Sequence, residues 1–221
     1  MNRVISWLCK ICLKFPVDRF LIKKISGQEN VPKGNFILAA NHQSHLDHIA
    51  TGYICVPRKF HYIGQTDRYR GFDRFLLNIL YFIAGVIRVH RENSESKKEA
   101  VEKSIEVIKK RASLIVYPEG TRTRNGKMGE GKPGIAKIFL KTGVPILPVG
   151  IKGTFGLMPP GSGFPKIKRE VKINIGKPLF FEEELNRAQK ISEDSMEYQE
   201  ILEKITKSIM SEIASLVEEA I

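Results

Sequence analysis

Short apolar runs alternate with segments of helical periodicity along most of this chain. Runs typical of buried strands occur at residues 36–39, 59–64, 86–89, 114–117, 144–149 and 171–175. Apolar residues three or four positions apart, typical of helices, recur at 48–54, 73–84, 94–111, 133–141 and from 197 onward. Strands that alternate with helices in this way predict an α/β fold, with a mixed, largely parallel sheet flanked by helices.

Capping residues set the ends of two of these helices. Ser94 is placed to accept hydrogen bonds from the first free amides of the helix over 94–111. Pro133 near the start and Gly143 just past the end of the helix over 133–141 follow the asymmetry that helices prefer. The glycine-, proline- and lysine-rich stretch at 153–169 is long for a plain connection, which favours a functional role for it.

The first 26 residues have a pattern of their own. Residues 4–15 are apolar except for a narrow stripe, and Pro16 is expected to end the helix that they form. The stripe consists of Arg3, Ser6, Lys10 and Lys14. Because residues 1–26 carry a net charge of +5, an amphipathic helix lying in a membrane interface is favoured. The alternative is a helix packed on the protein's own core.

Charge is distributed unevenly along the 221 residues. The whole chain carries +12, whereas residues 179–221 carry −7, which leaves +19 on residues 1–178. A basic body favours a phosphate-rich partner, namely nucleic acid, anionic lipid or a phosphorylated substrate. The alternative is an excess of lysine that only keeps the protein soluble. Aromatic and basic residues are not interleaved as they are in single-strand binders, so no nucleic acid is expected as a partner.

The first polar residues that could carry chemistry lie at 41–48, just after the strand predicted over 36–39. His42 and Asp47 are five positions apart, so they can meet only if a turn separates them. Ser44 supplies one, because its hydroxyl can cap a helix that begins at His45 and place Asp47 in the first turn. A carboxylate on one imidazole nitrogen leaves the other nitrogen free as a general base. The alternative is that Asp47 only caps the helix and His42 only bonds a backbone carbonyl.

A metal site is not expected. The run from His45 to His48 is similar to the H-x-H-x-D-H motif of metallo-β-lactamase-fold hydrolases, but Gln43 stands where the first histidine of that motif would be. Cys9 and Cys12 form a C-x-x-C pair without a second pair, which does not make a zinc site.

Two more polar groups follow predicted strands. Gly120 allows a sharp turn after the strand over 114–117, and Arg122 then offers a fork of donors suited to phosphate oxygens. Arg88 and Arg91 stand at the end of the strand over 86–89. Because strand ends on one sheet edge converge, these residues predict a phosphate-binding site beside the histidine. Taken singly, each arginine is typical of a protein surface.

With these groups in place, the sequence resembles the glycerolipid acyltransferases, in particular the bacterial 1-acyl-glycerol-3-phosphate acyltransferases. Four blocks of that family occur in order: N-H-Q-S-H-L-D at 41–47, G-V-I-R-V-H-R at 85–91, Y-P-E-G-T-R at 117–122 and V-P-I-L-P-V at 144–149. Gly-Lys-Pro at 176–178 is also typical of the family, so the resemblance spans residues 27–178.

The resemblance implies a role for each matching residue. His42 would deprotonate the acceptor hydroxyl, and Asp47 would orient the imidazole. Pro148 would help to form the apolar wall for the acyl donor. The residues expected to shape the acceptor-phosphate site are Arg88, Arg91, Glu119, Gly120, Thr121, Arg122 and Lys132.

The function implied is the transfer of a fatty acyl group from acyl-CoA or acyl-carrier protein to 1-acyl-glycerol-3-phosphate, which gives phosphatidic acid without a cofactor. A membrane-interfacial segment at 1–26 would hold an acyltransferase domain at 27–221 on an anionic membrane, peripheral or monotopic on the cytoplasmic face of the cell membrane. The alternatives are the same transfer to another lysophospholipid and a non-catalytic protein that binds anionic lipid.

Overall fold

A computed structural model describes residues 3–65, 84–90 and 93–220 of the chain. The helix expected at 73–84 lies outside these residues, apart from residue 84, and so does Arg91.

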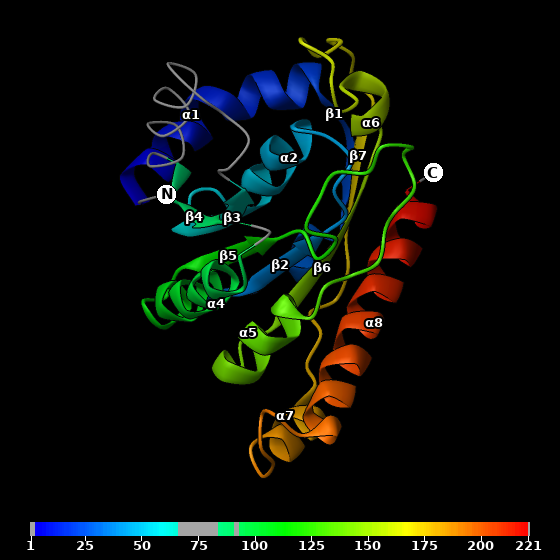
Figure 1. Cartoon of the computed structure of the whole chain (residues 1–221). Coiled ribbons are helices and arrows are strands. Elements are labelled where there is room, and N and C mark those ends of the chain that lie inside the picture. Colours follow the sequence, from blue (N-terminus) through cyan, green and yellow to red (C-terminus); the bar gives the residue numbers. More distant parts are fainter. Residues whose placement is uncertain (1–2, 66–83, 91–92, 221) are drawn as a thin grey trace.

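A mixed, seven-stranded sheet forms the centre of the described structure (Figure 1). Its order is β1-β7-β6-β2-β5-β3-β4. All neighbouring strands are parallel except β6 and β7. The strands are β1 (Ile22–Ser26), β2 (Ile37–Ala40), β3 (Phe60–Gln65), β4 (Val86–Val89), β5 (Ser113–Val116), β6 (Ile146–Lys152) and β7 (Val171–Ile175). The mixed, largely parallel α/β fold predicted from the alternating pattern is therefore confirmed.

Helices cover both faces of the sheet (Figure 1). Helices α1 (Arg3–Phe20) and α2 (Leu46–Cys55) pack on one face, where their apolar side chains share a core with β2 and β6. Helices α4 (Ser94–Lys109), α5 (Gly134–Thr142) and α8 (Met196–Glu219) pack on the other. A 3-10 turn η1 (Gln28–Asn30) and the short helices α6 (Thr154–Leu157) and α7 (Glu182–Ala188) complete the described elements.

The helix caps differ in part from the predicted ones. Asn93, not Ser94, caps α4, because its side-chain oxygen accepts the amides of Glu95 and Ser96 at 2.8 and 3.0 Å. The cap on α5 is as predicted: Pro133 precedes the helix, and Gly143 ends it with a left-handed φ of 64°. The strand β1 and the helix α7 have no counterpart in the sequence prediction.

The N-terminal helix is longer than predicted. Pro16 lies inside α1 and does not end it, and the helix continues to Phe20. A proline removes one backbone donor, but a helix whose other turns are packed can continue past it. Helix α1 leads directly into β1, which joins the sheet beside β7. Within the described residues, no helix combines the length and apolar character needed to cross a bilayer.

The direction of the strands decides where a site can form. Strands β2, β3, β4, β5 and β6 are mutually parallel, so their carboxyl ends meet at one edge of the sheet. After β2 the chain enters α2 on one face, and after β5 it continues to α5 on the other. The loops after the neighbouring strands β2 and β5 therefore leave the sheet on opposite faces. Open α/β folds bind ligands in the crevice that forms between such loops at the carboxyl edge of the sheet.

We expect Gly150 of β6 to be essential for docking α8 on the sheet. A Cβ at this position would lie 2.5 Å from the carbonyl carbon of Leu216 and 2.6 Å from the amide nitrogen of Val217. Because those atoms are helix backbone, Gly150→Ala should cost about 1–3 kcal/mol or more of unfolding free energy, measured by urea denaturation. Gly34→Ala is the control, since a Cβ there meets nothing within 4 Å. An unchanged midpoint for Gly150→Ala would contradict this packing.

Candidate active site

The loop after β2 is fixed to the neighbouring strand by Asn41. Nδ2 of the Asn41 side chain donates to the backbone carbonyl of Ile151, and Oδ1 of Asn41 accepts the backbone amide of Ile151, both at 2.8 Å. This pair of buried hydrogen bonds joins the end of β2 to β6. The next residue, His42, is therefore held at the carboxyl edge of the sheet.

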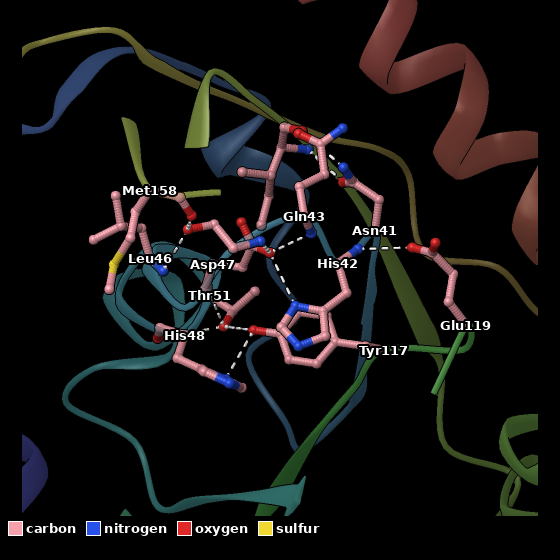
Figure 2. Close-up of polar contacts among 12 residues, drawn as sticks. Asn41, His42, Gln43, Leu46, Asp47, His48, Thr51, Tyr117, Glu119 and Met158 are labelled. Carbon is pink, nitrogen blue, oxygen red and sulfur yellow. Dashed lines mark hydrogen bonds and ion pairs between the residues drawn. The ribbon is translucent and has the colours of Figure 1, made fainter. Parts of the chain in front are cut away.

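His42 and Asp47 meet across a turn, as their spacing requires (Figure 2). Nδ1 of His42 lies 2.9 Å from Oδ2 of Asp47, whose side chain is fully buried. The same oxygen accepts the backbone amides of Gln43 and Ser44 at 2.6 and 2.7 Å. An acceptor at this position favours a proton on Nδ1 and leaves Nε2 of His42 with a free lone pair.

Ser44 turns the chain from the loop into α2. Its hydroxyl accepts the amide of Leu46 at 3.2 Å and donates to the carbonyl of Met158 at 2.7 Å. Because Oδ2 of Asp47 accepts the backbone amide of Ser44, the arrangement is close to a capping box. Asp47 therefore both holds the loop that precedes α2 and contacts the imidazole, so capping and the contact with His42 are not alternatives.

A tyrosine supports the imidazole from one side. The ring of Tyr117 stacks on that of His42, with centroids 4.0 Å apart and planes inclined by 13°. The Tyr117 hydroxyl shares hydrogen bonds with Oγ1 of Thr51 at 2.9 Å and with Nδ1 of His48 at 3.2 Å. Burial raises the pKa of Tyr117 well above 10, so the hydroxyl stays protonated at neutral pH. Stacking and hydrogen bonds together fix the plane of the His42 ring.

His48 lies behind this pair as a neutral group. Burial, which is the largest cause, and the electrostatic effect of the neighbouring His42 imidazole lower the pKa of His48 to about 3. Arg122 also lowers this pKa through its positive charge, although less strongly. The amide of Thr123 donates to the carbonyl of His42 at 3.0 Å, so the loop after β5 lies against the turn that carries His42. Sequence reasoning assigned no role to Tyr117 or His48, since each is explained only by its neighbours in space.

Glu119 contacts the backbone of this chain with both carboxylate oxygens. Oε1 accepts the amide of His42 and Oε2 accepts the amide of Gly129, each at 2.7 Å. The side chain is buried, and burial raises its pKa above the ordinary range despite these two hydrogen bonds. Glu119 thus joins the loop after β2 to the loop after β5. Its expected contact with the acceptor phosphate stays a prediction.

The loop after β5 also brings basic side chains to this edge. Gly120 has a left-handed φ of 67°, and Nζ of Lys132 lies 3.0 Å from the point that a Cβ at Gly120 would occupy. The amide of Lys132 donates to the carbonyl of Pro118 at 2.8 Å, which closes the loop. Thr121 is exposed and Arg122 is partly buried. The structure therefore places Lys132 against Gly120, in a loop whose residues Glu119 and Thr123 bond the backbone of His42. The predicted residue Arg122 lies in the same loop.

Two other predicted residues lie farther from the dyad. Arg88 is exposed on β4, the last strand of the described sheet, where it pairs with Gly64. Pro148 is buried in β6 on the face covered by α8, where its ring packs toward Gly176. His42 follows β2 on the α2 side, against Tyr117. Their expected contacts with the acceptor and the acyl donor remain predictions.

Among the described side chains, no group of three or more histidine, cysteine, aspartate or glutamate residues could hold a metal ion.

The fold and the dyad define an α/β protein with a histidine–aspartate pair at the carboxyl edge of its sheet, and comparison with known families places it further. Residues 23–152 match the family described as Acyltransferase, so this chain belongs to the acyltransferase family. All four sequence blocks fall inside the matched region, and the recognition made from them is confirmed.

Individual relatives agree. The chain is 30% identical over 179 residues to a chloroplastic 1-acyl-sn-glycerol-3-phosphate acyltransferase from Brassica napus, covering 79% of this chain and 50% of the relative. It is 34% identical over 150 residues to the 1-acyl-sn-glycerol-3-phosphate acyltransferase of Borreliella burgdorferi, covering 66% and 58%. The chain thus spans about half the length of the curated relatives that it matches.

A solved structure supports the same fold. The crystal structure of the 1-acyl-sn-glycerophosphate (LPA) acyltransferase PlsC from Thermotoga maritima matches with a TM-score of 0.61 at 26% identity. The match covers 96% of this chain and 79% of that chain.

Glu119→Gln tests the clamp between the two loops. An amide group must turn its NH2 toward the amide of either His42 or Gly129, so one of these two donors, the first buried and the second part-buried, loses its acceptor. We expect a loss of about 1–3 kcal/mol of unfolding free energy, measured by urea denaturation. The exposed neighbour Glu130 provides the control, and Glu130→Gln should change the value by less than about 0.5 kcal/mol. Equal midpoints for the two variants would refute the clamp.

Proposed function

We propose that this chain transfers a fatty acyl group from a thioester, acyl-CoA or acyl-carrier protein, to the free hydroxyl of 1-acyl-glycerol-3-phosphate. The product would be phosphatidic acid. The observation that carries the proposal is the 2.9 Å contact of His42 with Asp47, in a chain that belongs to the acyltransferase family. The names of the relatives support the choice of acceptor.

The chemistry needs one base and two aligned substrates. Nε2 of His42 takes the proton of the acceptor hydroxyl while the hydroxyl oxygen attacks the thioester carbonyl. The resulting tetrahedral intermediate expels the thiolate as the carbon–sulfur bond breaks, and the imidazolium of His42 returns the proton to that sulfur. Asp47 stabilises the imidazolium and keeps the ring oriented.

Direct transfer fits the side chains beside the dyad. The hydroxyl of Ser44 donates to the carbonyl of Met158 and does not bond His42. Because a thioester carbonyl is already activated toward attack, a base and correct positioning of the acceptor hydroxyl are enough for the transfer. No covalent acyl-enzyme intermediate is needed. The ring of Tyr117 contributes by holding the imidazole in one plane.

The acceptor phosphate would bind at the loop after β5. Arg122 and Lys132 supply two positive charges there, and the turn at Gly120 brings backbone close to them. Arg88, Arg91, Glu119 and Thr121 complete the proposed acceptor site, and Pro148 the proposed wall for the acyl donor.

The protein would act at an anionic membrane surface, peripheral or monotopic on the cytoplasmic face. Support comes from α1, whose inward side chains Ile5, Cys9 and Val17 pack on the core. Its outward surface exposes large apolar side chains, namely Val4, Trp7, Leu8, Ile11, Leu13, Phe15 and Phe20. Such a surface, together with the +5 charge of residues 1–26, suits a membrane interface.

His42→Ala tests the base. Wild type should release thiol from oleoyl-CoA only when lysophosphatidic acid is present, and the variant should be slower by roughly a hundredfold or more. The control is His45→Ala, because His45 is an exposed imidazole of the same loop, and it should retain most of the activity. Unfolding curves would show that both variants fold. Full activity of His42→Ala, or wild-type release that ignores the acceptor, would overturn the mechanism.

Trp7→Ser/Phe15→Ser tests docking through α1. Deletion of residues 1–26 would also remove β1 from the sheet, so substitution of exposed side chains is the cleaner test. We expect the share of protein that sediments with phosphatidylglycerol vesicles to fall severalfold, since apolar area leaves the interface. Phe180→Ser removes an equally exposed aromatic side chain from the opposite edge of the sheet and should bind as wild type does. Undiminished binding of the double variant would refute this docking surface.

A further inference from the structure

Besides α1, the segment at residues 159–169 also exposes large apolar side chains. We name this segment the 159–169 loop. Phe164 is 90% exposed and Ile167 is 82% exposed, so both project almost completely from the protein. Lys166, Lys168 and Arg169 lie beside them and are also exposed. Bulky apolar side chains among basic ones, with no cover from the described residues, call for a partner that is both apolar and anionic.

The base of this loop is fastened at several points. The carbonyl of Met158 accepts the Ser44 hydroxyl at 2.7 Å, and the amide of Lys166 donates to the carbonyl of Leu157 at 2.9 Å. Nε of Arg169 donates to the carbonyl of Ile22 at 2.7 Å. These hydrogen bonds join the loop to the turn between His42 and Asp47 and to the start of β1. The projecting side chains are therefore carried on a structured base.

Strand direction places the loop, the end of α1 and the dyad at the same edge of the sheet. The loop follows β6, which is parallel to β2, so both β6 and β2 end at that edge. Strand β1 runs antiparallel to β6, because it is parallel to β7, so β1 begins where β6 ends. In Figure 1 the yellow loop accordingly rises beside the end of α1 nearest β1.

The charge of this edge is also basic. Lys23 and Lys24 on β1 and Lys152 at the end of β6 are exposed there, in addition to the lysines of the loop. Among the loop's own basic groups, Lys168 pairs with Glu170. Each basic residue close to an anionic leaflet adds a favourable electrostatic contribution.

We propose that the 159–169 loop is a second lipid-contact element, which inserts Phe164 and Ile167 into an anionic bilayer beside α1. Side chains that project singly from a loop suit insertion between acyl chains, whereas a protein partner that is docked by apolar contacts needs a groove or face. Two contacts, α1 and the loop, would orient the protein and turn the edge that carries His42 toward the bilayer. The proposal extends the membrane docking proposed for α1 and does not depend on the acyl-transfer chemistry.

Paired variants test the loop. Phe164→Ser/Ile167→Ser removes both projecting side chains, and Phe180→Ser/Met196→Ser removes a similarly exposed pair from the opposite edge of the sheet. Both are compared with wild type by sedimentation with vesicles of equal parts phosphatidylglycerol and phosphatidylcholine. We expect the loop variant to lose roughly tenfold in partition coefficient and the control pair to match wild type. The proposal would be overturned if the loop variant and the control variant bound the vesicles equally well. It would also be overturned if wild type did not sediment with these vesicles.

A fluorescent reporter measures insertion directly. Trp7 is the chain's single tryptophan, so Trp7→Phe/Phe164→Trp places the reporter at the loop alone. Its emission should move to shorter wavelength when the vesicles are added, and brominated lipids should quench it. An emission that stays at the wavelength of a water-exposed indole would overturn the proposal.

Kinetics separate the possible outcomes. With a short-chain, monomeric lysophosphatidate as acceptor, Phe164→Ser/Ile167→Ser should turn over as wild type does, because the dyad is untouched. The variant could instead bind vesicles normally and show a higher KM than wild type for the acyl-carrier-protein donor but not for acyl-CoA. In that case the loop would be a protein-docking site, and the proposal would be wrong. If wild type failed to transfer acyl groups, the vesicle-binding measurement would still test the loop. The acyl-transfer proposal and the lipid-contact proposal can therefore fail independently.

Discussion

Oδ2 of Asp47 accepts three hydrogen bonds, from Nδ1 of His42 and from the amides of Gln43 and Ser44. A buried carboxylate needs such partners, because burial without them costs several kcal/mol. The loop between His42 and Asp47 therefore closes around the carboxylate, and this closure both starts α2 and aims the imidazole. Without this carboxylate, the backbone amides of Gln43 and Ser44 would lose their acceptor and the His42 ring would lose the contact that orients it. The local fold and the proposed chemistry therefore depend on the same atom, Oδ2 of Asp47.

The surrounding contacts extend this constraint across the sheet. Asn41 ties the loop to β6, and Glu119 ties the amide of His42 to the loop after β5. Tyr117 stacks on the imidazole and bonds α2 through Thr51. Tyr117 and Glu119 follow β5, far from Asn41 in the sequence, yet each of the three side chains limits one motion of His42. A base held in this way needs little reorganisation during proton transfer, which is the main benefit of a preorganised site.

The same edge of the sheet carries the features that suit a lipid surface. The reversal of direction between β6 and β7 brings the start of β1, and with it the end of α1, to the edge where β2 delivers His42. The 159–169 loop lies at that edge because it is the β6–β7 connection. A substrate with long acyl chains gains little from leaving the bilayer, since burial of those chains in lipid is what the hydrophobic effect favours. The orientation proposed above, with the edge that carries His42 facing the membrane, is consistent with that constraint.

The sequence by itself determined the alternation of strands and helices, through short-range periodicity, and the family, through four ordered blocks. It allowed His42 to meet Asp47 across a turn at Ser44, and the structure decided between that contact and simple capping. It failed at Pro16 and at Ser94, where packing and the neighbouring Asn93 outweighed the local preference. It also did not reveal β1, whose strand conformation depends on pairing with β7, far along the chain. Only the tertiary structure decided that Glu119 holds backbone, that Tyr117 supports the imidazole and that Pro148 lies on the α8 face. These facts concern contacts between residues distant in sequence, and no local pattern encodes which side chains a folded sheet brings together.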